Sequence, residues 1–129
     1  MSRHRRHPVA IGMLALLVTG AEASDRAALV REGEAVFFRC NACHSIGPAG
    51  PLDTGPSLQN IIGRRAGGLP GYAYTPALQG RDFHWTRRQL DRWLKAPQAI
   101  LPGVCLPFTG IESRRERRAL IEYLAQPLP

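Results

Sequence analysis

The sequence predicts an all-α domain, because its apolar residues recur at helical spacing and no useful stretch alternates between apolar and polar residues. Prolines and glycines are dense in two stretches, residues 45–56 and 67–80, which are therefore expected to form irregular loops. The 129 residues suffice for one domain, and no repeat or low-complexity tract indicates another. We therefore expect one helical domain with long loops.

The first 23 residues have the pattern of a secretory signal peptide. Three arginines among the first six residues precede an apolar run over residues 9–18, and Ala21-Glu22-Ala23 supplies a small-residue cleavage site. The apolar run is shorter than the roughly 20 residues that a membrane-spanning helix needs, which argues against an uncleaved anchor. We expect residues 1–23 to direct export to the periplasm and residues 24–129 to form the mature domain.

Cleavage changes the chemistry that remains available. It would remove three of the 17 basic and one of the 10 acidic side chains, which leaves a formal charge of +5. It would also remove both methionines and leave His44 and His84 as the only histidines. Three cysteines remain, and this odd number argues against a simple framework of paired disulfides.

The first helix of the mature domain is predicted over residues 25–39, with Ser24 or Asp25 as its N-cap. The residues on its expected inner face are Leu29, Val30, Gly33, Val36 and Phe37.

Two further helices are predicted in the second half of the chain. Thr86 can cap a helix that ends near Ala96, because Pro97 cannot continue it. The last helix is expected over residues 112–126, with four arginines in its first half. Its apolar residues, which face the expected core, are Leu120, Ile121, Tyr123 and Leu124.

The segment Cys40-Asn41-Ala42-Cys43-His44 carries the clearest chemical signal. In the C-x-x-C-H spacing, two thiols can add to the two vinyl groups of haem while the histidine ligates the iron. A zinc site would need about four nitrogen or sulfur ligands, and only Cys105 and His84 remain to complete one. A thioredoxin-like C-x-x-C would need a βαβ setting, which the helical pattern does not provide. One covalent haem c per chain is the favoured interpretation.

These residues belong to a wider pattern that resembles the class I cytochromes c of the mitochondrial and bacterial short-chain type, over residues 25–126. The similar segments are Gly33-Glu34-Ala35-Val36-Phe37, Gly55-Pro56, Gly63-Arg64, Gly71-Tyr72-Ala73-Tyr74, Trp85-Thr86, Trp93-Leu94, Pro102-Gly103, Phe108-Thr109-Gly110-Ile111 and Tyr123-Leu124. The resemblance implies the cytochrome c fold, with three main helices, a short helix and long loops around the haem. It also implies a single-electron carrier, not an enzyme, that works with a redox partner protein.

The resemblance also implies roles for single residues. The far ring nitrogen of the axial ligand His44 would donate a hydrogen bond to the Pro56 carbonyl, which would fix the ring. One haem propionate would accept hydrogen bonds from Arg64, Tyr74 and Trp85. The first and last helices would cross at Gly33, Phe37 and Tyr123.

The sequence departs from the family at the second axial position. Where the family has a methionine ligand, this chain has Leu106, whose hydrocarbon side chain cannot bind iron, and residues 24–129 contain no methionine. Trp93 stands where the family usually has a tyrosine that approaches the methionine sulfur. Leu78 and Val104 replace polar residues. This indicates an apolar pocket on the sixth-ligand side of the haem.

Three possibilities remain for the sixth position of the iron. Cys105 could bind ferric iron as a thiolate, the site could be open or hold water, or His84, Lys95 or another group could reach it. Loss of methionine ligation predicts a lowered reduction potential. An open site makes binding or sensing of nitric oxide or carbon monoxide the alternative function. A catalytic role ranks last because no acid and base pair is apparent.

Of the haem-edge positions that the family fills with lysines, Arg39 remains basic, but most of the positive charge lies elsewhere. It is carried by Arg87, Arg88, Arg92, Arg114, Arg115, Arg117 and Arg118. Solvated helix faces are the favoured interpretation, although an acidic partner or a membrane surface would also be attracted. The interleaved aromatic residues of a nucleic-acid site are missing, so we expect no nucleic-acid partner. We also expect the protein to be a monomer.

Overall fold

The computed structural model describes residues 11–48, 54–104 and 107–126. In these ranges the chain forms four helices: α1 (Ile11–Phe37), α2 (Arg87–Lys95), α3 (Pro97–Ile100) and α4 (Arg114–Leu124). The same ranges contain no strand, only an isolated bridge between Arg65 and His84. The predicted all-α class, with three main helices and a short one, is therefore confirmed.

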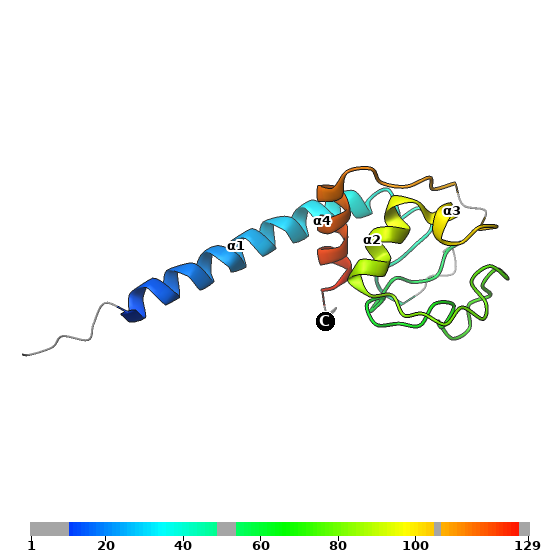
Figure 1. The fold of residues 1–129 in the computed structure, drawn as a ribbon, viewed down its shortest axis with the longest axis horizontal. Coiled ribbons are helices and arrows are strands. Elements are labelled where there is room, and N and C mark those ends of the chain that lie inside the picture. The colour runs from blue at the N-terminus through cyan, green and yellow to red at the C-terminus, as the bar shows by residue number, and fades with distance from the viewer. Residues whose placement is uncertain (1–10, 49–53, 105–106, 127–129) are drawn as a thin grey trace, which may run out of the picture.

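Helix α1 is longer than the sequence predicts. It starts at Ile11 and runs through Ser24 and Asp25 without a break, so the expected N-cap at these residues is wrong for the full chain. The apolar segment before Ser24 is rich in alanine and leucine, which propagate a helix, and no proline interrupts it. Figure 1 shows the N-terminal part of α1 projecting away from the other helices. None of the helices in the described ranges has the length and hydropathy that a bilayer crossing requires.

The C-terminal part of α1 crosses α4 at a very short distance. A Cβ on Gly33 would overlap the carbonyl oxygen of Ala119 and lie 2.7 Å from Cβ of Tyr123. One turn further along, the rings of Phe37 and Tyr123 pack with centroids 5.5 Å apart. The predicted crossing at Gly33, Phe37 and Tyr123 is therefore present, and only glycine permits this close approach.

Helices α2 and α3 follow the chemistry of their ends. The hydroxyl of Thr86 accepts a hydrogen bond from the backbone N–H of Gln89, which caps α2 as predicted. Pro97 ends α2 and then opens the short helix α3, where its missing N–H costs nothing. Helix α4 begins two residues later than predicted because Ser113 is its N-cap, and its hydroxyl accepts from the N–H of Glu116.

The core lies where α1, α2 and α4 meet the loop residues around Trp85. Its buried apolar side chains are Val36, Phe37, Ile61, Ala66, Trp85, Leu90, Leu94, Ile111, Leu120, Ile121 and Leu124. Burial of this apolar surface supplies the main favourable term for folding.

One arginine of α4 is part of this interior. Arg117 is only 5% exposed, so the expectation that it lies on a solvated face is wrong. Its Nε donates to Oδ1 of Asp91 at 2.8 Å, and its Nη1 donates to the carbonyl oxygens of Ile111 and Glu112 at 2.9 and 2.8 Å. The guanidinium thereby joins α4 to α2 and to the loop that leads into α4. Its burial is possible because these acceptors satisfy its charge and hydrogen bonds.

Replacing Gly33 with alanine should lower the free energy of unfolding of the haem-loaded protein by about 2 kcal/mol. The added methyl group would push apart the backbones of α1 and α4, and the better helix propensity of alanine offsets only part of this loss. Denaturant unfolding measures the change. Glu34→Ala is the matched control, because Glu34 is exposed on the same helix. Equal stabilities of the two variants would contradict the close crossing.

Candidate functional site

The C-x-x-C-H segment forms the turn that follows α1. The N–H of Cys40 donates to the carbonyl of Phe37 at 2.7 Å, and the N–H groups of Cys43 and His44 donate to the carbonyl of Cys40 at 3.1 and 3.0 Å. These bonds continue the winding of α1 for one more turn after its last residue. The position of the motif is therefore set by the packing of Phe37 against α4.

Both cysteines of the motif are unpaired and half-buried. Burial raises the pKa of the Cys40 thiol, and this effect outweighs that of the nearby Arg39, which acts in the opposite direction. A redox-active C-x-x-C needs a lowered thiol pKa so that thiolate is available for attack. The environment of Cys40 therefore favours a thiol and argues against the thioredoxin-like alternative. Among the described residues, no group of three or more His, Cys, Asp or Glu side chains could hold a metal ion.

The imidazole of His44 is fixed from one side. Its Nδ1 lies 2.7 Å from the carbonyl oxygen of Pro56, close enough for the ring N–H to donate to this acceptor. With the proton on Nδ1, the lone pair of Nε2 is free to bind a metal. The contact is the one that the resemblance implied, and it supplies the orienting hydrogen bond that metal-ligating histidines usually make.

Two backbone bonds bring Pro56 to His44. The N–H of Gly55 donates to the carbonyl of Cys43 at 2.8 Å, and that of Leu58 donates to the carbonyl of Ser45 at 2.8 Å. A Cβ on Gly55 would lie 2.5 Å from Cε1 and 2.7 Å from Nδ1 of the His44 ring. A glycine is therefore required before Pro56, because any side chain would displace the imidazole.

Ser57 is a structural residue that the sequence did not single out. It is only 4% exposed, and its hydroxyl donates to the carbonyl of Gly47 at 2.5 Å and accepts from the N–H of Gln59 at 3.2 Å. These bonds hold the loop after His44 against the segment that contains Pro56. A serine directly after Gly-Pro is a turn signal that could have indicated this role.

The three residues expected at a propionate lie near one another. Arg64 and Trp85 are joined by the bond from the Trp85 N–H to the Arg64 carbonyl, at 2.8 Å. The Arg64 guanidinium donates to the carbonyl of Ser57 at 2.7 Å. Burial lowers the pKa of Arg64, and Tyr74 lies close enough to act in the opposite direction. The fold therefore gathers a cation, a phenol and an indole in one region.

The remaining candidates fall into two groups. Trp93 is partly buried, with its ring centroid 5.5 Å from that of Trp85, whereas His84 and Lys95 are exposed. Cys105 and Leu106 lie outside the described residues. The structure therefore describes the region around His44 and Trp85 in detail, and the sixth-ligand segment only up to the buried Val104.

Several apolar side chains remain partly exposed although they pack against the core. They are Ile46, Leu58, Ile62, Leu78, Phe83, Trp93 and Phe108. Their uncovered surface is suited to contact with a flat hydrophobic group. The free thiols, the oriented His44 and these apolar side chains have the chemistry that a covalently attached haem requires.

The chain is similar to several cytochromes over most of its length. It is 43% identical over 98 residues to a cytochrome c2 of Agrobacterium tumefaciens, a match that covers 74% of this chain and 88% of the relative. It is 37% identical over 97 residues to cytochrome c-550 of Nitrobacter winogradskyi, which covers 75% and 89% of the two chains. It is 35% identical over 114 residues to cytochrome c2 of Blastochloris viridis, which covers 88% and 87%. No model of a protein family matches the chain. The identities and coverage, together with the all-helical fold, show that the chain belongs to the class I cytochrome c family, with the cytochromes c2 and c-550 among its relatives.

Proposed function

We propose that Cys40 and Cys43 form the two thioether bonds to haem and that His44 is the proximal ligand of its iron. As a member of the cytochrome c family, the protein is an electron carrier and not an enzyme, and it has one covalent haem c. The observation that carries the proposal is the hydrogen-bond contact between His44 Nδ1 and the Pro56 carbonyl, which leaves Nε2 available as the metal-binding atom.

When bound, haem c supplies an iron that gains or loses one electron. The residues of the chain bind and orient this group. The Pro56 carbonyl holds the imidazole in one tautomer and raises its basicity. Arg64, Tyr74 and Trp85 are proposed to bind one propionate, because a guanidinium, a phenol and an indole N–H are all donors that pair with a carboxylate.

The proposed sixth-ligand side differs from that of the family. We propose that Leu106 occupies the position of the usual methionine, since no methionine follows residue 13. We propose that this change lowers the reduction potential, since methionine ligation raises the potential of cytochromes c. Either Cys105 binds the iron or the position remains open. An open position would allow nitric oxide or carbon monoxide to bind, which makes ligand binding or sensing the second candidate function.

The protein is proposed to act as a monomer in the periplasm, after cleavage of residues 1–23. The three arginines before the apolar run of residues 9–18 support a signal peptide. The general secretory route is proposed because haem attachment outside the cytoplasm requires that the chain arrive unfolded. The protein partners of this redox carrier are proposed to be acidic, because the mature domain has a formal charge of +5. Contact with a membrane surface would use the same charge.

A redox titration followed by absorption should give one reversible one-electron transition. Its midpoint should rise in Leu106→Met, which restores the family ligand, and remain unchanged in the control Leu69→Met. A midpoint that does not change in Leu106→Met would contradict the proposed cause of the lowered potential.

Adding carbon monoxide to the reduced protein separates the two candidate functions. An unchanged absorption spectrum favours an electron carrier whose sixth position is occupied. A shifted spectrum favours an open sixth position that binds small ligands.

Gly55→Ala should weaken the bond between His44 and the iron, because the new methyl group would push the imidazole away from the Pro56 carbonyl. Loss of such an orienting contact typically costs about 10- to 100-fold in metal affinity. Electron paramagnetic resonance of the ferric protein should therefore show a larger high-spin fraction than in the wild type. Gly47→Ala is the control, since nothing lies within 4 Å of a Cβ at Gly47. Identical spectra for both variants would exclude the proposed role of Gly55.

A further inference from the structure

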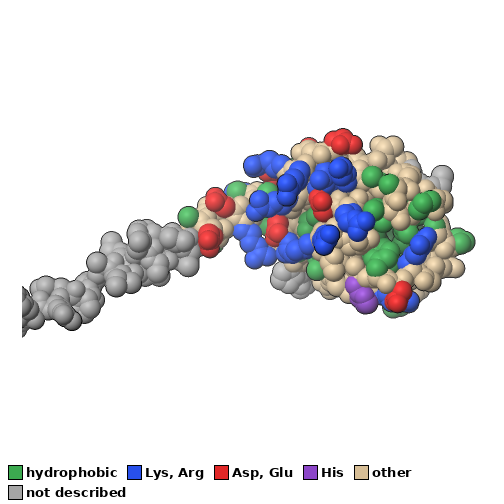
Figure 2. All heavy atoms as spheres, viewed as in Figure 1, with side chains coloured by type: hydrophobic (Ala, Val, Ile, Leu, Met, Phe, Trp, Pro, Cys, Tyr) green, Lys and Arg blue, Asp and Glu red, His purple; other side chains and the backbone are tan. Residues whose placement is uncertain are grey.

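The arginines of α2 and α4 form a basic face that haem binding does not explain. These two helices together carry seven arginines, and Figure 2 shows Lys and Arg side chains gathered on the face near the junction with α1. Arg115 is paired with Glu32 of α1, and Arg117 is buried against Asp91. The other arginines of this face are exposed.

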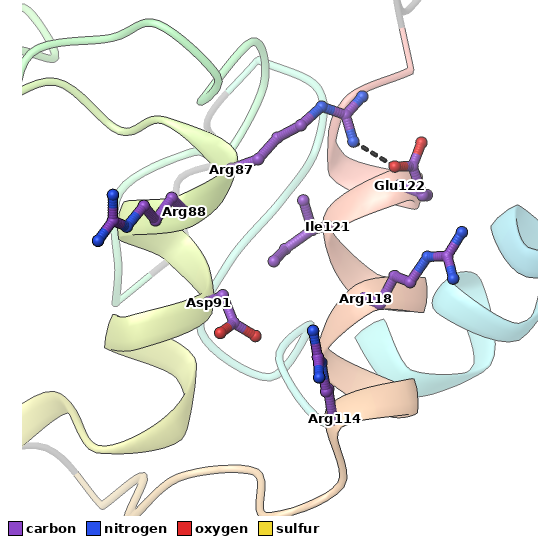
Figure 3. A pocket seen from close by; sticks show the side chains of 7 residues that line it. All are labelled: Arg87, Arg88, Asp91, Arg114, Arg118, Ile121 and Glu122. Atoms are coloured by element: carbon purple, nitrogen blue, oxygen red, sulfur yellow. Dashed lines mark hydrogen bonds and ion pairs between the residues drawn. The ribbon is translucent and has the colours of Figure 1, made fainter.

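A cavity of about 270 Å³ opens between α2 and α4. Figure 3 shows Asp91 and Ile121 projecting toward the space between the helices, with Arg114 beside it, whereas Arg88 points outward from α2 and Arg118 points from α4 toward α1. The residues that line it are Arg87, Arg88, Asp91, Arg114, Arg118, Ile121 and Glu122. We call this feature the α2–α4 groove.

The two carboxylates of the groove are already engaged. Asp91 accepts from Arg117 at 2.8 Å, and Glu122 is paired with Arg87 and with Arg26 of α1. Within the described ranges, no carboxylate lies within 4.0 Å of the guanidinium groups of the other three arginines. These three are Arg88, Arg114 and Arg118. Three exposed guanidinium groups of the groove residues can therefore donate hydrogen bonds to an external anion.

The chemistry of the groove favours separate carboxylates over a continuous anionic surface. A guanidinium presents a planar fork of donors that pairs two-to-two with a carboxylate. Asp91 remains partly exposed between the arginines, with a side-chain exposure of 43%, and would repel closely spaced lipid phosphates. Separated carboxylates on a peptide can avoid Asp91, and the buried Ile121 adds an apolar side chain to the lining of the groove. This mixture of charges and apolar surface is typical of protein interfaces.

The groove is separate from the haem-attachment turn. Its residues belong to α2 and α4, whereas Cys40, Cys43 and His44 belong to the turn after α1. None of the groove side chains makes a described hydrogen bond or ion pair to that turn. A protein segment bound in the groove would therefore contact α2 and α4 rather than the residues of the turn.

We propose that the α2–α4 groove is an anchoring site for an acidic segment of a partner protein, bound through Arg88, Arg114 and Arg118. This inference rests on the proposed function, because it names where the acidic redox partner would bind. Anchoring here holds the cytochrome to its partner while the haem-attachment end stays free to exchange electrons. Binding is electrostatic and weakens as salt rises.

The test uses the haem-loaded protein and a dye-labelled peptide in which six glutamates alternate with glycines. Binding is followed by fluorescence anisotropy at an ionic strength of about 0.15 M, the physiological value. The triple variant Arg88→Gln, Arg114→Gln, Arg118→Gln should bind about tenfold more weakly, since each exposed ion pair contributes modestly. The matched triple variant Arg31→Gln, Arg65→Gln, Arg81→Gln has the same net charge, and its affinity should change by less than about twofold. Equal losses in the two triple variants would overturn the proposal.

Two further arms identify the ligand class and the residues. Glu122→Gln releases Arg87 and Arg26 and should tighten peptide binding, so unchanged or weaker binding contradicts the proposal. Vesicles of phosphatidylglycerol and phosphatidylcholine, or inorganic pyrophosphate, should depend less on the three groove arginines than the peptide does. If vesicle or pyrophosphate binding depended more strongly on the three arginines than peptide binding does, the ligand would be a membrane or a free phosphate and the proposal would be wrong. The absorption spectrum and reduction potential should be the same in all variants, which separates this test from the proposed haem ligation.

Discussion

The close crossing of α1 and α4 at Gly33 determines where the C-x-x-C-H turn lies. Because Gly33 has no side chain, the backbone of α1 reaches that of α4, and Phe37 then packs against Tyr123. The carbonyl of Phe37 accepts the N–H of Cys40, so the attachment turn starts from this packed position. The helix crossing therefore sets the position of Cys40, the first residue of the C-x-x-C-H turn.

The attachment turn also needs a support on its other side. The segment of Gly55 and Pro56 supplies it, because its backbone pairs with Cys43 and its carbonyl fixes the ring of His44. The buried Ser57 and the guanidinium of Arg64 hold this segment in turn. The proximal side of the site is therefore built from two chain segments, and neither could orient the imidazole alone.

The sequence predicted those features that depend on local chemistry. Thr86 capped α2, Pro97 ended it, and Gly33, Phe37 and Tyr123 met at the crossing. The start of α1 was missed because no proline separates residues 11–23 from the predicted helix, so nothing there stops the helix.

Features that depend on tertiary contacts were not predictable from periodicity. The burial of Arg117 depends on Asp91, 26 residues away, and nothing in the run of arginines distinguishes it from its exposed neighbours. The role of Ser57 similarly depends on the fold of the loop that contains Gly47.

All of these roles depend on the proposed covalent attachment of haem to Cys40 and Cys43. Intact mass spectrometry of the protein, produced in a bacterium that attaches haem c and measured under reducing and denaturing conditions, tests it most directly. We expect one species, with the mass of the chain from Ser24 to Pro129 plus one haem. The double variant Cys40→Ser, Cys43→Ser should have the mass of the chain alone. A wild-type chain without added haem mass would exclude covalent attachment.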